Sequence, residues 1–268
     1  MKNIELYKLL EIPDEVEKKL VEYGNMRNVH LPDTTVRKVL NRSEWSEGIG
    51  ELQEALGDDP DGIKMLWELL NIAGTYSYTE YIKHNISMDI FADTMKFCTR
   101  FLKEHYRNFQ TYQLIWAWWF PRQISLNEFR IGALEYEFVD EGKREIEIHI
   151  PSDADLRKEQ VALSLESFYA FRRKYFAGWE AVCLTCSTWM LMPELKEFLG
   201  ENSNIVLFQN LFEIENVDYE ATWYMGWIFP GIQTIDEQLP EKTMLQRKLK
   251  QYLLSGKKFG IAKGRLKA

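Results

Sequence analysis

The sequence predicts an α/β protein, more strictly of the α+β kind, with a helical N-terminal part followed by a mixed β-sheet and flanking helices. Apolar residues in the first 120 positions recur at spacings of three and four, which is typical of helices. After Pro121 the pattern changes to alternation with a period of two, which favours strands. Strand-like and helix-like segments then follow in the order strand, strand, helix, strand, helix, strand, strand. We therefore expect domains at residues 1–122 and 123–268, the second ending in a basic tail.

In the first part, two stripes of apolar side chains predict two helices, and a third, short helix is expected after Pro32 with Asp33 or Thr34 as its N-cap. The stripes consist of Ile63, Leu66, Trp67 and Leu70, and of Phe91, Met95, Cys98 and Leu102.

In the second part, FRIGALEYEF and REIEIHI alternate on either side of a glycine-containing turn and predict an antiparallel hairpin. A long helix is predicted over 156–176 and a short helix over 193–200. The remaining predicted strands are WEAVCLTCSTWML (179–191), NIVLFQNLFEI (204–214) and ATWYMGWIF (221–229).

Composition excludes several classes of protein. The conspicuous apolar run LIWAWWF (114–120) is too short to span a membrane, and the N-terminus lacks the pattern of a signal peptide. Three cysteines form no disulfide framework, so we expect a cytoplasmic protein. The net charge of −8 divides into +9 for the segment from Lys242 onward and −17 for the rest. The acidic total argues against a nucleic-acid partner, and the basic segment either meets phosphates or pairs with the acidic body.

Four stretches carry a resemblance to a known family: RQISLNEFRIGALEYEF, IHIPSDADLRKEQVALSLESF, CSTWMLMPELKEFLGENSNIVLFQNLFEI and LPEKTMLQRKLKQYLLSGKKFGIAKGRL. With the strand–helix order, they are similar to bacterial acyltransferase domain-containing proteins, which join a helical N-terminal domain to a C-terminal domain like that of the GNAT N-acyltransferases. The resemblance covers residues 115–268 well and the helical half more loosely. It implies transfer of an acyl group from acyl-CoA to an unidentified small-molecule amine by direct attack. The composition by itself gives no reason to expect a membrane partner.

The resemblance also implies where the site lies. In GNAT proteins a strand, loop and helix hold the cofactor pyrophosphate, and EIEIHIPSDADLRKEQV (145–161) has that form. Candidate cofactor contacts there are Ile150, Ser152, Arg157 and Lys158. His149 alternates with Glu147, opposite the isoleucines, so we expect His149 as general base and Glu147 as second choice. Cys186 and Ser187 are expected beside the acyl group, and a covalent role for either requires an additional base.

Two departures from the GNAT pattern keep an alternative open. The loop has no glycine between Ile150 and Ala177, and Asp153 or Asp155 is expected to cap the helix in competition with a phosphate. The segment 193–202 lacks the tyrosine expected to protonate the leaving thiolate. The alternative is a non-catalytic small-molecule-binding or regulatory protein on the same scaffold, so the sequence leaves open whether the chain is an enzyme. Cys183 and Cys186 point to opposite faces of a strand, and no metal site is expected.

Overall fold

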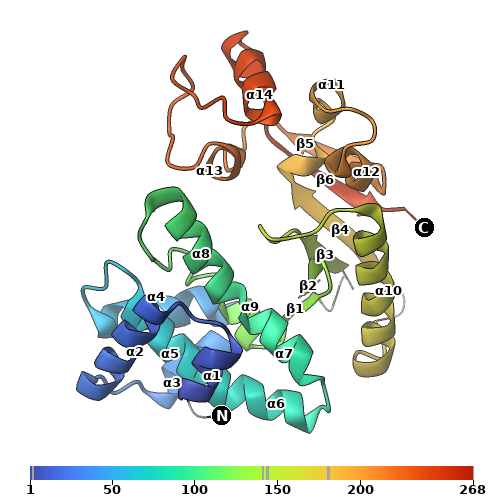
Figure 1. Ribbon diagram of the computed structural model, residues 1–268. Helices are drawn as coiled ribbons and strands as arrows, with labels where there is room; N and C mark the ends of the chain where they lie inside the picture. Colours follow the sequence, from blue (N-terminus) through green and yellow to red (C-terminus); the bar gives the residue numbers. More distant parts are fainter. Residues whose placement is uncertain (2, 141, 143–144, 180–181, 268) are drawn as a thin grey trace. The chain divides into compact units, whose positions relative to one another are not determined.

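The structure, a computed structural model, describes residues 1, 3–140, 142, 145–179 and 182–267, which form two compact units (Figure 1). Unit 1 comprises Met1–Ile131 and two short later segments, Glu135–Glu137 and Pro151–Asp153. Unit 2 comprises residues 132–134, 138–150 and 154 onward. The helical part followed by a mixed sheet is confirmed, whereas the domain boundary after residue 122 stays a prediction.

In the described residues, unit 1 is helical apart from the strand Glu128–Ile131 and the strand residues Glu135–Glu137. The first predicted stripe lies on one helix, with Trp67 half-buried, whereas the second stripe is divided between the helices Met88–Met95 and Phe97–Phe109. Phe91, Met95, Cys98 and Leu102 are fully buried. None of the helices in the described part of the chain has the length and hydropathy that a membrane span requires. The elements are α1 (Asn3–Leu9), α2 (Asp14–Met26), α3 (Asp33–Leu40), α4 (Trp45–Leu56), α5 (Ile63–Ile72), a π-helical turn (Ala73–Ser77), α6 (Tyr78–Lys83), α7 (Met88–Met95), α8 (Phe97–Phe109), α9 (Pro121–Ile124) and β1 (Glu128–Ile131).

A buried ion pair joins two helices of unit 1. Glu68 on α5 is 1% exposed, which isolated carboxylates do not tolerate. Its oxygens accept hydrogen bonds from Arg27, just beyond α2, at 2.6 and 3.1 Å and from the Tyr23 hydroxyl at 3.2 Å. The Arg27 guanidinium also lies over the Trp67 ring, at 5.1 Å from its centroid. The half-exposed Trp67 therefore covers the ion pair.

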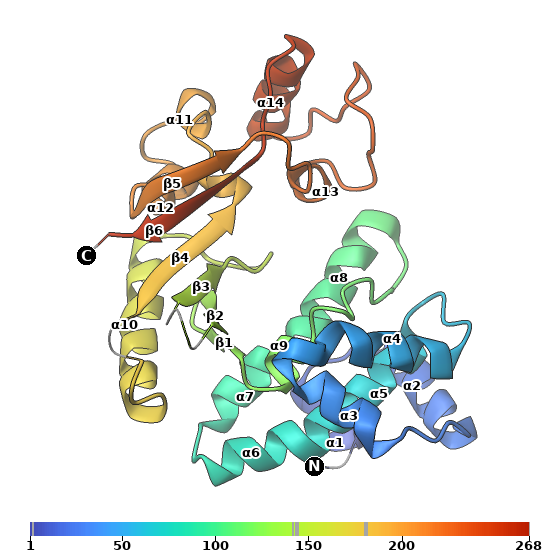
Figure 2. The same ribbon diagram turned by 180° about the vertical axis from the view of Figure 1, so that it is seen from behind.

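The sheet has the strand order β1-β2-β3-β4-β6-β5. β3 and β4 are parallel and are connected through α10, whereas β6 runs antiparallel to both β4 and β5. Helices α10 and α12 lie on the same side of the sheet (Figures 1 and 2). The elements of this half are β2 (Leu134–Asp140), β3 (Glu145–His149), α10 (Lys158–Tyr175), β4 (Cys183–Thr188), α11 (Leu195–Phe198), α12 (Asn204–Gln209), β5 (Phe212–Asp218), α13 (Tyr224–Ile228), α14 (Met244–Leu254) and β6 (Ile261–Leu266).

Two predicted strands are interrupted for identifiable reasons. The segment 129–138 turns at Gly132, whose φ of +63° ends β1 before β2 begins. The segment 204–214 starts as α12, because the Ser203 hydroxyl accepts a hydrogen bond from the Val206 N–H at 3.2 Å and caps a helix. Only its last residues enter β5, which continues to Asp218.

One further prediction for the C-terminal region was wrong. The segment 221–229 contains α13 instead of a strand, with Tyr224, Met225 and Ile228 buried at helical spacing. The basic segment forms α14 and β6, and its cations pair with acidic residues, as one of its two interpretations expects. Thr243 and Gln246 make a capping box at the start of α14, and β6 pairs with strands on both of its sides.

Candidate active site

Strand β3 has one apolar and one polar face, as its sequence predicts. Ile146 and Ile148 are at most 1% exposed, whereas Glu145, Glu147 and His149 alternate with them and are half-buried. The pairing of β3 with β4 places Glu147 level with Thr185. The Thr185 hydroxyl donates to the Glu145 carboxylate at 2.8 Å, so these side chains share one face. We call this the polar face of the sheet.

Strand β4 separates the two acyl-pocket candidates. Ser187 is two residues beyond Thr185 and therefore lies on the polar face with His149 and Glu147. Cys186 lies on the opposite face and is 1% exposed. Burial, followed by the negative charge of Glu147, raises the pKa of the Cys186 thiol well above its usual value. A thiol that stays protonated is a poor nucleophile. The Cys186 side chain therefore suits a packing role better than covalent catalysis.

Strand β6 adds a cation to the polar face. Lys263 is level with Ser187, and its ammonium donates to the Glu145 carboxylate at 2.7 Å. That hydrogen bond raises the pKa of Lys263 above its usual value, so the side chain carries its charge at neutral pH. Sequence reasoning missed Lys263 because it treated the basic segment as a tail rather than as a strand of this sheet.

Among the described residues, Glu147 is the half-buried carboxylate of the polar face that remains available, since Glu213 on β5 is exposed. Glu145 pairs with Lys263, and Glu215 on β5 pairs with Arg265 at 2.6 Å. Glu147 makes no hydrogen bond or ion pair with any residue in the described part of the chain. A half-buried carboxylate without a partner can accept a proton or bind an ammonium group.

The loop after β3 differs from the expectation that an aspartate caps α10. The N-cap position is Arg157, and its side chain makes no capping hydrogen bond. Asp155 accepts the Arg157 backbone N–H at 3.0 Å and binds the Arg157 side chain at 2.9 and 3.0 Å. Asp153 pairs with Arg130 at 3.0 Å. The capping prediction was therefore wrong, because both carboxylates pair with arginine side chains instead.

The start of α10 therefore has backbone N–H groups that are available to a ligand. Backbone hydrogen bonding within the helix begins with the N–H groups of Gln160 and Val161, which donate to the Arg157 carbonyl. Within the described residues, the N–H groups of Lys158 and Glu159 have no acceptor. The Lys158 side chain is exposed at the same end, as is Ser152 earlier in the loop, whereas Ile150 is half-buried.

Unit 1 contains buried carboxylates that the sequence did not single out. The Glu137 carboxylate, 4% exposed, lies 2.7 Å from Arg42 and 3.4 Å from Arg122. The Arg122 guanidinium lies 4.0 Å from the centroid of the Trp119 ring, and the indole N–H of Trp119 donates to Glu128 at 2.9 Å. Alternating EYE within an apolar strand was the available signal, but the arginine partners are 15 to 95 residues away.

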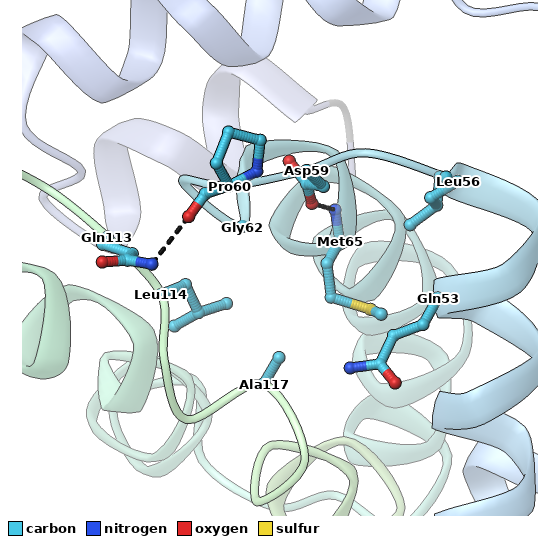
Figure 3. Close-up of a pocket in the computed structure, with 10 residues that line it drawn as sticks. Gln53, Leu56, Asp59, Pro60, Gly62, Met65, Gln113, Leu114 and Ala117 are labelled. Atoms are coloured by element: carbon cyan, nitrogen blue, oxygen red, sulfur yellow. Dashed lines mark hydrogen bonds between the residues drawn. The ribbon is translucent and has the colours of Figure 1, made fainter.

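Unit 1 also contains a cavity of about 320 Å³ (Figure 3). Its rim is fixed by hydrogen bonds: Asp59 accepts the N–H groups of Lys64 and Met65, and the Gln113 side chain donates to the Pro60 carbonyl. None of the predicted site residues lines it. The residues that line it are Gln53, Leu56, Gly57, Asp59, Pro60, Gly62, Met65, Gln113, Leu114 and Ala117.

The fold and the family comparison define the class of this protein. Residues 128–266 match the GNAT-like C-terminal domain, and residues 1–126 match the N-acyltransferase N-terminal domain. The chain therefore belongs to the family of proteins that join these two domains.

Solved acyltransferase structures share the fold. The chain is similar, at 18% identity and a TM-score of 0.76, to an acyltransferase in complex with decanoyl-CoA and teicoplanin, over 98% of this chain and 86% of that one. A complex with CoA and 10C-teicoplanin gives a TM-score of 0.78 at the same identity and coverage. A further complex with decanoyl-CoA gives a TM-score of 0.64 at 17% identity, over 99% of both chains. A comparison with curated protein sequences found no match.

Proposed function

We propose that this chain transfers an acyl group from an acyl-CoA thioester to a small-molecule amine. The observation that carries the proposal is the polar face of β3, with Glu147 and His149, in a chain whose two domains match acyltransferase families. The similar structures contain decanoyl-CoA or CoA, and two of them contain teicoplanin or its 10C form, which supports a small-molecule acceptor. The free thiols of all three cysteines support a cytoplasmic location.

The start of α10 supplies what the glycine-free loop lacks. The N–H groups of Lys158 and Glu159 and the Lys158 ammonium offer hydrogen bonds and positive charge to a pyrophosphate. Asp155 already neutralises Arg157, so the repulsion expected from the acidic loop is reduced. Ile150 and Ser152 complete the proposed contact region.

The reaction is direct acyl transfer. The amine nitrogen attacks the thioester carbon, the new N–C bond forms, the C–S bond breaks, and CoA leaves as a thiolate that takes up a proton. Glu147 or His149 takes the proton that the acceptor's ammonium group must lose before its nitrogen can attack. An unpaired carboxylate also attracts the ammonium form of the acceptor to the polar face. Ser187 lines the acyl group on the same face, and Cys186 packs behind it.

Calorimetric titration with acetyl-CoA, octanoyl-CoA, decanoyl-CoA and free CoA tests the cosubstrate. We expect at least one of the acyl-CoA esters to bind with a Kd in the micromolar range. Free CoA should bind with a higher Kd, because the acyl chain adds apolar burial. Absence of binding for all four at millimolar concentration would sink the proposal. The acceptor is then identified by testing a panel of primary amines with the ester that binds. Release of free CoA thiol reports the reaction, and mass spectrometry detects the amide product.

A further inference from the structure

The connection between β3 and α10 is anchored in unit 1. Pro151–Asp153 pack with unit 1, although the residues before and after them belong to unit 2. The Asp153 carboxylate accepts a hydrogen bond from Arg130 on β1 at 3.0 Å. The Arg100 Nε on α8 lies 3.7 Å from the same Asp153 oxygen. One carboxylate is thus shared by two guanidinium groups, which we call the Asp153 anchor.

The two arginines are themselves fixed in place. Arg100 and Arg130 are 9% and 11% exposed in their side chains, whereas Asp153 is 52% exposed. Arg100 donates to the Asp93 carbonyl at 3.0 Å and pairs with the buried Glu135. The backbone N–H of Arg130 donates to the Thr94 hydroxyl at 3.0 Å. The loop is therefore bound at Asp153 to a rigid, charged surface on unit 1.

The anchor also balances charge beside the loop. Arg100 and Arg130 face Glu135 and Asp153, so the four side chains carry no net charge together. A carboxylate that is neutralised in this way repels a nearby phosphate much less than an isolated one does. The acidic sequence of the loop therefore overstates its repulsion of a phosphate, because Asp153 and Asp155 are both paired with arginines.

We propose that Asp153 is a positioning residue for acyl-CoA binding. It fixes the chain four residues before the Arg157 N-cap and thereby restricts the conformations of the loop that leads to the donors of α10. Restricting the loop before binding lowers the entropy that binding must overcome. The inference rests on the proposed function, because it assigns the phosphates of acyl-CoA to the start of α10.

The test compares Asp153→Asn, which keeps the shape and removes the charge, with Asp153→Glu, which keeps the charge. Asp61→Asn is the matched control, because Asp61 is 51% exposed in its side chain and pairs with Lys19 at 3.0 Å. Two quantities are measured on the full chain: amide hydrogen exchange of residues 152–157 without ligand, and the Kd for decanoyl-CoA by calorimetry. Melting temperature reports whether each variant is folded.

We expect Asp153→Asn to speed exchange in 152–157 and to weaken decanoyl-CoA binding roughly three- to tenfold, which corresponds to the loss of a partly exposed, charge-assisted contact. Asp153→Glu, which keeps the charge, should change both the exchange rate and the Kd less than Asp153→Asn does. Asp61→Asn should change neither quantity. Unchanged exchange, or faster exchange with an unchanged Kd, overturns the positioning role. If the wild-type chain binds no acyl-CoA, the proposed function fails, and exchange alone then decides whether Asp153 anchors the loop.

Discussion

At the scale of single residues, partners decide which of several similar side chains is available for chemistry. Four glutamates lie on β3 and β5 of one sheet, and two of them, Glu145 and Glu215, pair with Lys263 and Arg265. Glu147 has no such partner in the described part of the chain. A sequence shows that these residues alternate, but it does not show which of them is already neutralised.

Replacing Glu147 by Gln tests this assignment. The variant keeps the shape and removes the base, so we expect kcat for amide formation to fall about 100-fold or more while the melting temperature stays within about 2 °C. Glu213→Gln is the control, because Glu213 is an exposed carboxylate on β5, in the same sheet. A Glu147→Gln chain with wild-type turnover, together with a slow His149→Asn chain, assigns proton removal to His149 instead.

A buried tyrosine gives unit 1 a predictable response to alkaline pH. Burial, followed by the negative charge of Glu17, raises the pKa of Tyr7 to about 12 from 10.0. The folded state therefore retains a proton that the unfolded chain releases near pH 10, and this contribution to stability is lost as pH rises from 10 through 12. The expected loss from Tyr7 at pH 11 is roughly 1 kcal/mol.

Urea unfolding of the wild type and of Tyr7→Phe at pH 8 and pH 11 measures this contribution. Tyr7→Phe removes the ionisable group and should lose less stability between the two pH values. The wild type should still lose more than Tyr7 alone explains, because the pKa of Tyr23 is also raised to about 12 by burial and by Glu68. Equal losses in the two proteins contradict the assignment to Tyr7.

At the scale of elements, the sequence predicted what depends on local pattern and missed what depends on partners. The long helix at 156–176 and the alternation at 145–149 were predicted because one apolar stripe or one apolar face determines them. The helical state of 224–228 and the strand at 261–266 were missed. The segment 224–228 has aromatic residues that are compatible with either a helix or a strand. The segment 261–266 is a strand because it pairs with β4 on one side and β5 on the other, which its local sequence does not show.

The junction before β6 illustrates how tightly that strand is fitted. Gly260 precedes β6, and a Cβ atom on it would lie 1.9 Å from the Asp218 carbonyl oxygen at the end of β5. Gly260→Ala must therefore displace backbone, and we expect a loss of about 1–3 kcal/mol in the free energy of unfolding. Gly200→Ala is the matched control, because its Cβ meets nothing within 4 Å. Equal urea midpoints for the two variants would show that β5 and β6 separate more easily than this packing indicates.

At the scale of the whole molecule, the family boundary and the boundary of the compact units do not coincide. The N-terminal family domain ends at residue 126, whereas unit 1 also includes Glu135–Glu137 and Pro151–Asp153. These segments supply carboxylates to arginines on the helices: Glu137 to Arg42 and Arg122, and Glu135 to Arg100. The helical half thus depends on residues that follow it in the sequence.

Two fragments test this dependence. A chain of residues 1–126 loses the carboxylate partners of three arginines and the strand residues that cover them, whereas a chain of residues 1–153 keeps both. Removing one partner of a buried ion pair costs about 3 kcal/mol or more, so the shorter fragment should melt well below the longer one by circular dichroism, or fail to fold. Glu137→Gln in the full chain removes the carboxylate partner of Arg42 and Arg122 and should lower the melting temperature without truncation. Closely matching melting temperatures for the two fragments would instead mean that the helices form a self-sufficient domain and that the later segments only dock against it.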